Sequence, residues 1–211
     1  MKTFLILNGP AGSGKGTLAM NLINHGFHII GAGEELRNYI KNADKNDPLR
    51  LRLEHKINFG LNVDTNDLYS IIEKKIHSIN GRIIGDGIVR TEDQAEWLVN
   101  YVDSNKQLVH FINLTCPTDV LVDRLSNRFF VPNSPHPYPS YGAANVACKN
   151  GEIPICRKDD KPELIKNRLD EYQQNIDVIL GIIDNKEHIN IHNIDTQDTP
   201  DAIKNKVLAL I

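Results

Sequence analysis

Short apolar runs alternate with amphipathic segments along most of this 211-residue chain. This alternation is typical of βαβ units, so we predict an α/β fold with a parallel five-stranded sheet covered by helices on both faces. The expected strands are Thr3–Leu7, Phe27–Ile30, Arg82–Asp86, Leu108–Leu114 and His188–Ile194. The expected helices are Lys15–His25, Glu34–Lys41, Pro48–Phe59, Asn66–Ile79, Glu92–Val102, Asp119–Phe129, Pro162–Ile183 and Asp201–Leu210.

One long segment interrupts this alternation. Val131–Pro154 is rich in Pro, Gly, Ser and Asn and has no helical period. An irregular insertion of this length inside a compact α/β domain is typical of a lid, a binding loop or disorder. The prolines at 132, 135, 137 and 139 would stiffen it.

The composition indicates the compartment and the kinds of partner of the protein, but not a reaction. A net charge of −3 gives no overall attraction to nucleic acid or membranes, and no apolar stretch approaches the length of about 20 residues that spans a bilayer. The apolar run at the N-terminus is too short for a signal peptide. The cysteines, Cys116, Cys148 and Cys156, lack CxxC spacing and fit a reducing compartment. We therefore expect a soluble cytoplasmic monomer that binds neither nucleic acid nor membrane.

A glycine-rich turn follows the first expected strand. In "ILNGPAGSGKGT", Ile6–Thr17, the glycines allow successive backbone N–H groups to point at an anion, and Lys15 adds a positive charge where a helix begins. The pattern agrees with GxxxxGK, although Gly16 replaces the usual Ser or Thr and Thr17 follows one position later. The turn predicts binding of a nucleoside triphosphate.

Arginines are concentrated beside the remaining motif segments. Transfer of a phosphoryl group between two anionic substrates requires such charge, both to bring the anions together and to stabilise the transferred group. A hydrolase or a switch would instead need a group that orients water, and no convincing motif of that kind is present. Arg124 and Arg128 are four residues apart, and we place them on one face of a helix at the edge of the irregular segment. The arginines concerned are Arg37, Arg90, Arg124, Arg128, Arg157 and Arg168.

Taken together, the motifs resemble those of the adenylate kinase family of nucleoside monophosphate kinases. They occur in the family's order and at similar spacing. They are "GPAGSGKGT" (Gly9–Thr17), "GAGEELR" (Gly31–Arg37), "GDGIVRTEDQAEWL" (Gly85–Leu98), "VDRLSNR" (Val122–Arg128) and "RKDDKPELIKNRLDEY" (Arg157–Tyr172). The resemblance implies a P-loop core (residues 1–30, 65–128 and 158–211), a helical acceptor-binding insert (31–64) and a lid segment (129–157).

The resemblance also implies the residues that bind ATP. Lys15 would follow the transferred group, Arg124 would stack on the adenine, and Arg128 and Arg157 would close over the phosphates with the lid. Asp86 would position hydrated Mg²⁺. The residues implied for ATP are Gly12, Ser13, Gly14, Lys15, Gly16, Thr17, Arg124, Arg128 and Arg157, and those implied for catalysis are Lys15, Arg90, Arg124, Arg157 and Arg168.

AMP would bind on the other side of the reacting phosphate. Arg37 and Arg90 would hold its phosphate, and Gln94 would read its base. The residues implied are Ala32, Arg37, Val63, Asp64, Gly87, Arg90, Gln94 and Arg168. Asp159 and Asp160 would lie at the hinge of the lid, and Asp160 also suits the N-cap of the following helix.

Several positions depart from the family pattern. Ile88 and Val89 replace an aromatic residue and a proline before Arg90, which removes a rigid bend, so we expect an altered acceptor site. Ala32 replaces a threonine that contacts the acceptor base. The segment Gly60–Leu68 matches the family's acceptor loop only with an extra residue.

The lid segment departs as well. Some relatives hold it with zinc through two Cys-x-x-Cys pairs. The matching positions here are Val131, Ser134, Ala147 and Asn150, and Cys148 and Cys156 have the wrong spacing, with His136 the remaining candidate ligand. We expect no zinc. Tyr138 is expected either to contact ATP or to pack within the lid.

The predicted activity is reversible transfer of the terminal phosphoryl group of Mg·ATP to AMP, giving two ADP. One alternative is a kinase for UMP, CMP or another small acceptor, suggested by Ala32. The other is a nucleotide-binding protein without transfer activity, suggested by Ile88 and Val89.

Overall fold

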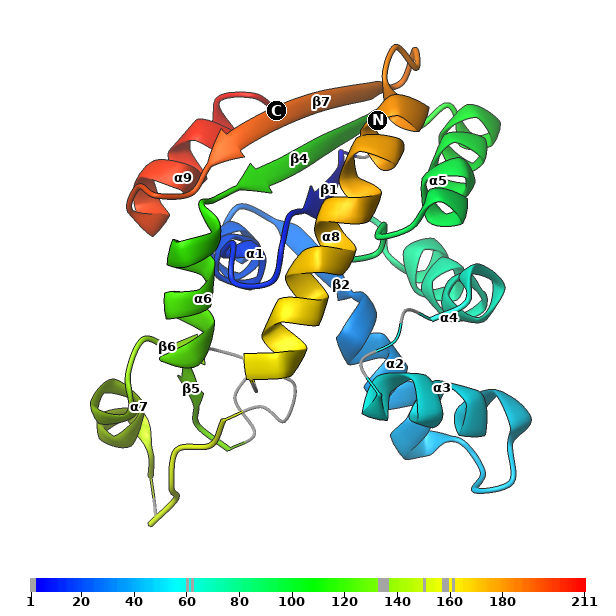
Figure 1. The fold of residues 1–211 in the computed structure, drawn as a ribbon. Coiled ribbons are helices and arrows are strands. Elements are labelled where there is room, and N and C mark those ends of the chain that lie inside the picture. The colour runs from blue at the N-terminus through cyan, green and yellow to red at the C-terminus, as the bar shows by residue number, and fades with distance from the viewer. Residues whose placement is uncertain are drawn as a thin grey trace.

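The computed structural model describes residues 3–59, 61, 63–132, 137–149, 151–156, 160 and 162–211, the side chains of residues 162 and 163 excepted. Its centre is a five-stranded sheet in the order β2-β3-β1-β4-β7, and every neighbouring pair is parallel (Figure 1). The predicted fold class is confirmed. The strands are β1 (Phe4–Asn8), β2 (Phe27–Gly31), β3 (Arg82–Asp86), β4 (Val109–Thr115) and β7 (Ile189–Asp195).

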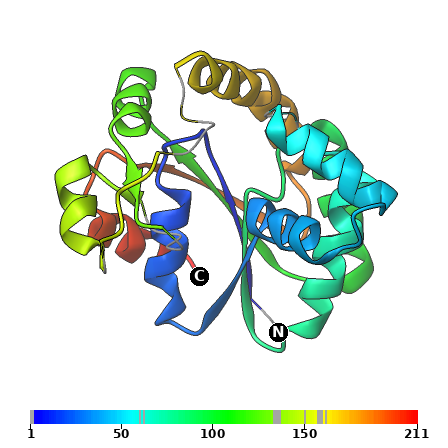
Figure 2. The ribbon, with the colours of Figure 1, turned by 90° about the horizontal axis from the view of Figure 1, so that it is seen from below.

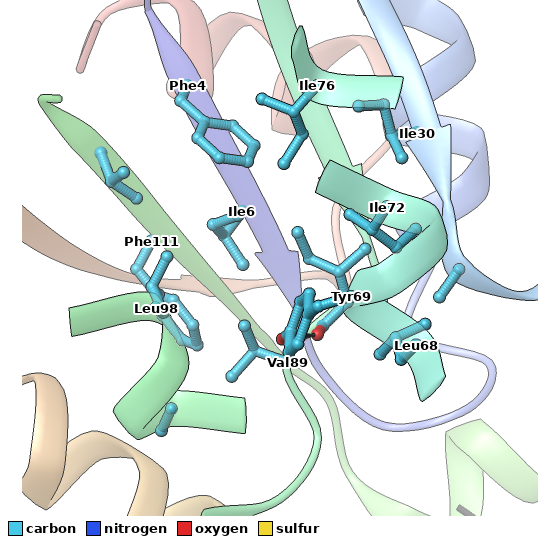
Figure 3. Packing of buried hydrophobic residues seen from close by; sticks show 14 of the residues in the cluster. Phe4, Ile6, Ile30, Leu68, Tyr69, Ile72, Ile76, Val89, Leu98 and Phe111 are labelled. Atoms are coloured by element: carbon cyan, nitrogen blue, oxygen red, sulfur yellow. Dashed lines mark hydrogen bonds between the residues drawn. The ribbon is translucent and has the colours of Figure 1, made fainter. Parts of the chain in front are cut away.

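Helices cover both faces of the sheet, which is why its central strands are mostly apolar. All of β1 is buried: Ile6 packs in the cluster on one face (Figure 3), and Leu5 and Leu7 pack in the cluster on the other. Figure 2 shows the two helical layers on either side of the sheet. On one face lie α1 (Lys15–Ile23) and α9 (Pro200–Leu208), and on the other lie α4 (Thr65–Ser78), α5 (Glu92–Asn105) and α8 (Pro162–Ile183).

A pair of helices projects from the carboxyl end of β2 (Figure 1). They are α2 (Ala32–Asn42) and α3 (Pro48–Asn58). Asp47 joins them, because its carboxylate caps α3 by accepting from the Leu49 N–H at 2.8 Å and also accepts from the Tyr39 hydroxyl at 2.7 Å. The sequence Asp47-Pro48 thus begins α3 with an N-cap followed by a proline in the first turn.

The structure corrects two expectations near the lid segment. Helix α6 (Thr118–Ser126) ends before Phe129, because β5 (Phe129–Phe130) pairs with β6 (Pro137–Tyr138) in an antiparallel ribbon. The segment expected to be irregular also contains α7 (Tyr141–Ala147). The Ser140 side chain caps α7 by accepting from the Ala143 N–H.

Candidate active site

The glycine-rich turn forms a tight loop between β1 and α1. Gly12 and Gly14 have φ of +83° and +92°, a region that L side chains rarely adopt. The Lys15 ammonium lies inside this loop and donates to the carbonyls of Gly9 and Pro10 at 2.6 and 2.8 Å. The backbone of the turn therefore holds the lysine at the N-terminus of α1, where an anion would be stabilised.

Lys15 lies among charged side chains contributed by distant parts of the chain. Burial lowers its pKa from 10.5 to about 7; the Asp86 carboxylate opposes this shift, whereas Arg90, Arg168 and Arg128 reinforce it. The fold thus brings these residues close enough to Lys15 to act on its charge. The three arginines place positive charge beside Lys15, as a site for bound phosphates requires.

The lowered pKa of Lys15, about 7, predicts a pH dependence of ATP binding. Only the protonated amine attracts phosphate, and a bound anion raises its pKa, so ATP affinity should fall as the pH rises above about 7. We expect the Kd for ATP, measured by calorimetry from about pH 6 to about pH 9, to increase across this range. Lys15→Arg is the control, since arginine stays protonated throughout. If the two proteins gave parallel profiles, the depressed lysine pKa would be excluded.

Arg90 lies in a turn after β3 that is held by local hydrogen bonds. Its Nε donates to the Gly87 carbonyl at 3.0 Å, and its backbone N–H donates to the Gln94 side-chain oxygen at 2.7 Å. Gly87 has φ +65°, which favours glycine at this position. Gln94 is buried, and its amide also donates to the Val63 carbonyl at 3.4 Å. Gln94 therefore links the turn to the segment that precedes α4.

The two residues that depart from the family motif are part of the hydrophobic core. Ile88 and Val89 are both buried in the cluster between the sheet and helices α4, α5 and α8 (Figure 3). The buried Tyr69 hydroxyl donates to the Ile88 carbonyl at 2.6 Å. The turn is thus anchored by core packing and by a buried hydrogen bond.

Arg124 and Arg128 have different partners. Arg124 belongs to α6 and donates to the carbonyl of the buried Thr196, after β7, at 2.7 Å. Arg128 lies beyond the end of α6, so the expectation that both lie on one helical face is wrong. The Asp160 carboxylate accepts from Arg128 Nε and Nη2, both at 2.6 Å, and from Arg168 at 3.4 Å. Asp160 therefore joins the base of the lid segment to α8.

The Arg128–Asp160 pair is largely buried, with side-chain exposures of 16% and 3%. Asp160→Asn removes the charge and leaves Arg128 without its buried counterion. We expect the free energy of unfolding to fall by about 3 kcal/mol, because breaking one partner of a buried pair is costly. Urea denaturation of the variant measures this. Asp170→Asn, at an exposed carboxylate on α8, should leave stability unchanged; equal losses in the two variants would contradict the assignment.

Two charged side chains of the site remain available to a ligand. Arg37 is exposed on α2, and Asp86 ends β3 half-buried. Neither forms a hydrogen bond or an ion pair with another residue in the described part of the chain. Both can therefore bind a charged ligand without breaking a bond that the fold already uses.

The other residues that the sequence singles out have mixed positions. Ala32 is buried at the start of α2, and Val63 packs against the core. Asp64 precedes α4 and accepts from Lys56 at 3.1 Å. Tyr138 lies in β6, half-buried. Arg157, Asp159, Ser134, His136 and Asn150 lie outside the described residues.

Sequence reasoning missed some of the groups around the arginines. Glu171 on α8 lies near two of them: burial raises the pKa of its carboxyl, and Arg90 and Arg168 lower it. Two further residues were also missed: Thr196, which accepts from Arg124, and Tyr69, which donates to the turn before Arg90. No local motif marks these residues, because each acts on a partner far along the chain.

The described ranges contain no group of three or more His, Cys, Asp and Glu side chains placed to hold a metal ion. None of their helices combines the length and apolar character needed to cross a bilayer. Cys116, Cys148 and Cys156 are free thiols.

Comparison with known proteins gives consistent similarities. A family model described as adenylate kinase matches residues 7–188. An adenylate kinase of Chlamydia caviae is 32% identical over 217 aligned positions, covering 98% of this chain and 96% of the relative. Those of Mesoplasma florum (30% identical, covering 92% of this chain and 93% of the relative) and Methanosarcina mazei (32%, 86% of each) are also similar. The family match spans the glycine-rich turn, residues 31–64 and residues 129–157.

Proposed function

The chain belongs to the adenylate kinase family, and we propose that its site transfers the terminal phosphoryl group of ATP reversibly to AMP, giving two molecules of ADP. It is a phosphotransferase of the nucleoside monophosphate kinase type. The observation that carries the proposed mechanism is the charge cluster at Lys15, where Arg90, Arg128 and Arg168 act on the lysine from separate elements. This arrangement suits two polyanions meeting end to end.

On the donor side, we assign the phosphates of ATP to the turn formed by Gly12, Ser13, Gly14, Lys15, Gly16 and Thr17. Lys15 follows the transferred group. When its ammonium leaves the Gly9 and Pro10 carbonyls, its N–H groups become available to donate to the phosphates. Arg124 stacks on the adenine, and Arg128 and Arg157 close over the phosphates. The Arg124 side chain donates to the Thr196 carbonyl, just after the edge strand β7. Its helix, α6, lies beside the glycine-rich turn, because Leu121 and Leu125 lie next to Gly12.

On the acceptor side, Arg37 and Arg90 hold the AMP phosphate, and Arg168 bridges towards the reacting groups. Gln94, with Ala32, Val63, Asp64 and Gly87, lines the site for the base and its ribose. The turn at Gly87 supports this assignment, because it fixes the Arg90 side chain before any ligand binds.

Mg²⁺ fits the residues present. Asp86 provides a carboxylate beside Lys15 that is not used by another described residue, and Thr17 provides a hydroxyl; both are the hard oxygen donors that this ion prefers. When bound with ATP, the ion would neutralise phosphate charge. We propose no zinc, because Val131 and Ala147 occupy two of the positions where ligands would be needed.

Catalysis then requires no side-chain nucleophile. An oxygen of the AMP phosphate attacks the terminal phosphorus of ATP in line, and the bond to the ADP leaving oxygen breaks. Lys15 and the arginines stabilise the charge that spreads over the transferred group. We propose that residues 31–64 close over AMP and residues 129–157 close over ATP, which excludes water from the reaction.

We propose that the protein works as a cytoplasmic monomer on ATP and a nucleoside monophosphate, with neither nucleic acid nor membrane as partner. The three free cysteines support a reducing compartment. The net charge of −3 argues against a nucleic-acid partner.

The stoichiometry of the products tests this function. Incubation with Mg·ATP and AMP should form two ADP for each AMP consumed, with no release of inorganic phosphate above the rate without enzyme, as measured by anion-exchange chromatography. Phosphate release that does not depend on AMP would identify an ATPase instead. Tight ATP binding without ADP formation would identify a non-catalytic nucleotide-binding protein.

A further inference from the structure

The turn Gly87–Arg90, which we call the acceptor turn, lacks the proline of the family motif, and a tyrosine of helix α4 contacts it. Val89 occupies the position before Arg90, and the Tyr69 hydroxyl of α4 donates to the carbonyl of the preceding residue, Ile88, at 2.6 Å. We propose that Tyr69 is a positioning residue for AMP binding, whose hydroxyl holds the turn that presents Arg90. This inference rests on the proposed function.

The tyrosine ring is held firmly enough to serve this purpose. It is 3% exposed and stacks on Trp97 of α5, with ring centroids 3.6 Å apart and planes inclined by 8°. The Trp97 indole N–H donates to Glu73 of α4 at 2.7 Å, so both rings are fixed between these two helices. Burial also raises the pKa of the Tyr69 hydroxyl well above its usual value, which keeps it protonated as a donor.

The bond acts on a backbone carbonyl between the two hydrogen-bonded points of the turn. Arg90 is tied to Gly87 through its side chain and to Gln94 through its backbone. The Ile88 carbonyl lies between these two hydrogen-bonded points, and it accepts from the Tyr69 hydroxyl. Without that hydroxyl, the peptide between Ile88 and Val89 can rotate, and the Arg90 guanidinium loses its fixed direction. A proline at position 89 would restrict the same peptide through its ring.

The test is Tyr69→Phe, which keeps the stacked ring and removes only the hydroxyl. We expect the KM for AMP to rise about tenfold, the amount that loss of one buried hydrogen bond can cause, with the KM for ATP within about twofold of the wild type. Ser70→Ala is the matched control, since it removes a neighbouring exposed hydroxyl that donates to the Asp67 carbonyl. It should change neither constant.

Rescue separates positioning from a general structural role. Adding Val89→Pro to Tyr69→Phe should restore most of the AMP affinity, because the ring replaces the constraint that the hydroxyl provided. Calorimetric titration with AMP gives a second readout that does not depend on turnover. Equal KM values in wild type and Tyr69→Phe, equal losses for AMP and ATP, or a double variant no better than Tyr69→Phe alone would overturn the inference. A wild-type protein that forms no ADP from ATP and AMP would instead overturn the proposed function and this inference with it.

Discussion

Replacing Lys15 by alanine is expected to reduce ADP formation from ATP and AMP by about 1,000-fold or more in kcat. In the free protein its ammonium is held by the carbonyls of Gly9 and Pro10, within reach of Asp86 and three arginines. It is the only cation that the P-loop itself contributes. Without it, the turn has no positive charge of its own to follow the phosphoryl group during transfer.

The fold should survive this change. Burial lowers the pKa of Lys15, so the folded state gains little from carrying the charge there. The circular dichroism spectrum should therefore match that of the wild type, and Tm should change by no more than roughly a few degrees. Lys186→Ala, at an exposed lysine before β7, is the matched control and should retain full activity. Near-normal turnover by Lys15→Ala would refute the assignment of the phosphate site.

Arg90→Ala should lower kcat/KM for AMP by about 1,000-fold, with binding of ATP weakened far less. The Gly87 carbonyl orients the guanidinium of Arg90, which lies close enough to Lys15 for the two charges to interact. From this position Arg90 can contact both the acceptor phosphate and the transferred group. Initial rates at varied AMP and saturating ATP measure the loss. Arg90→Lys should recover only part of it, because an ammonium cannot bind phosphate through two parallel bonds.

The strand that precedes the Arg90 turn offers a control. Arg82 begins β3, at the amino end of the strand, where it stacks over Phe27 and donates to the His25 carbonyl. Arg82→Ala should keep its kinetic constants while losing a little stability. If Arg90→Ala and Arg82→Ala affected AMP kinetics equally, the acceptor site would have to lie elsewhere.

The sheet could be predicted from the sequence because its strands are buried on both faces. Runs such as Phe4–Asn8 and Val109–Thr115 are predominantly apolar and are bounded by turn residues, so their positions follow from the sequence alone. Helix α7 could not be predicted in this way. Its sequence, YGAANVA, has small residues and no amphipathic period, and the helix is stabilised by the local Ser140 cap and by the burial of Ala144.

The site was predictable where its chemistry is local. The glycine-rich turn contains both its backbone donors and Lys15 within one short stretch. The partners of the arginines are not local: Thr196 is 72 residues from Arg124, and Asp160 is 32 residues from Arg128. Such pairs depend on how the helices pack, and no short motif encodes them.

The acceptor base is the central claim that remains to be measured. A coupled assay of ADP production with Mg·ATP and AMP, GMP, UMP or CMP tests it most directly. We predict that kcat/KM for AMP exceeds that for UMP and CMP by about 100-fold or more, because we assign the acceptor base to Gln94, which favours a purine. A preference for UMP or CMP over AMP would contradict the account.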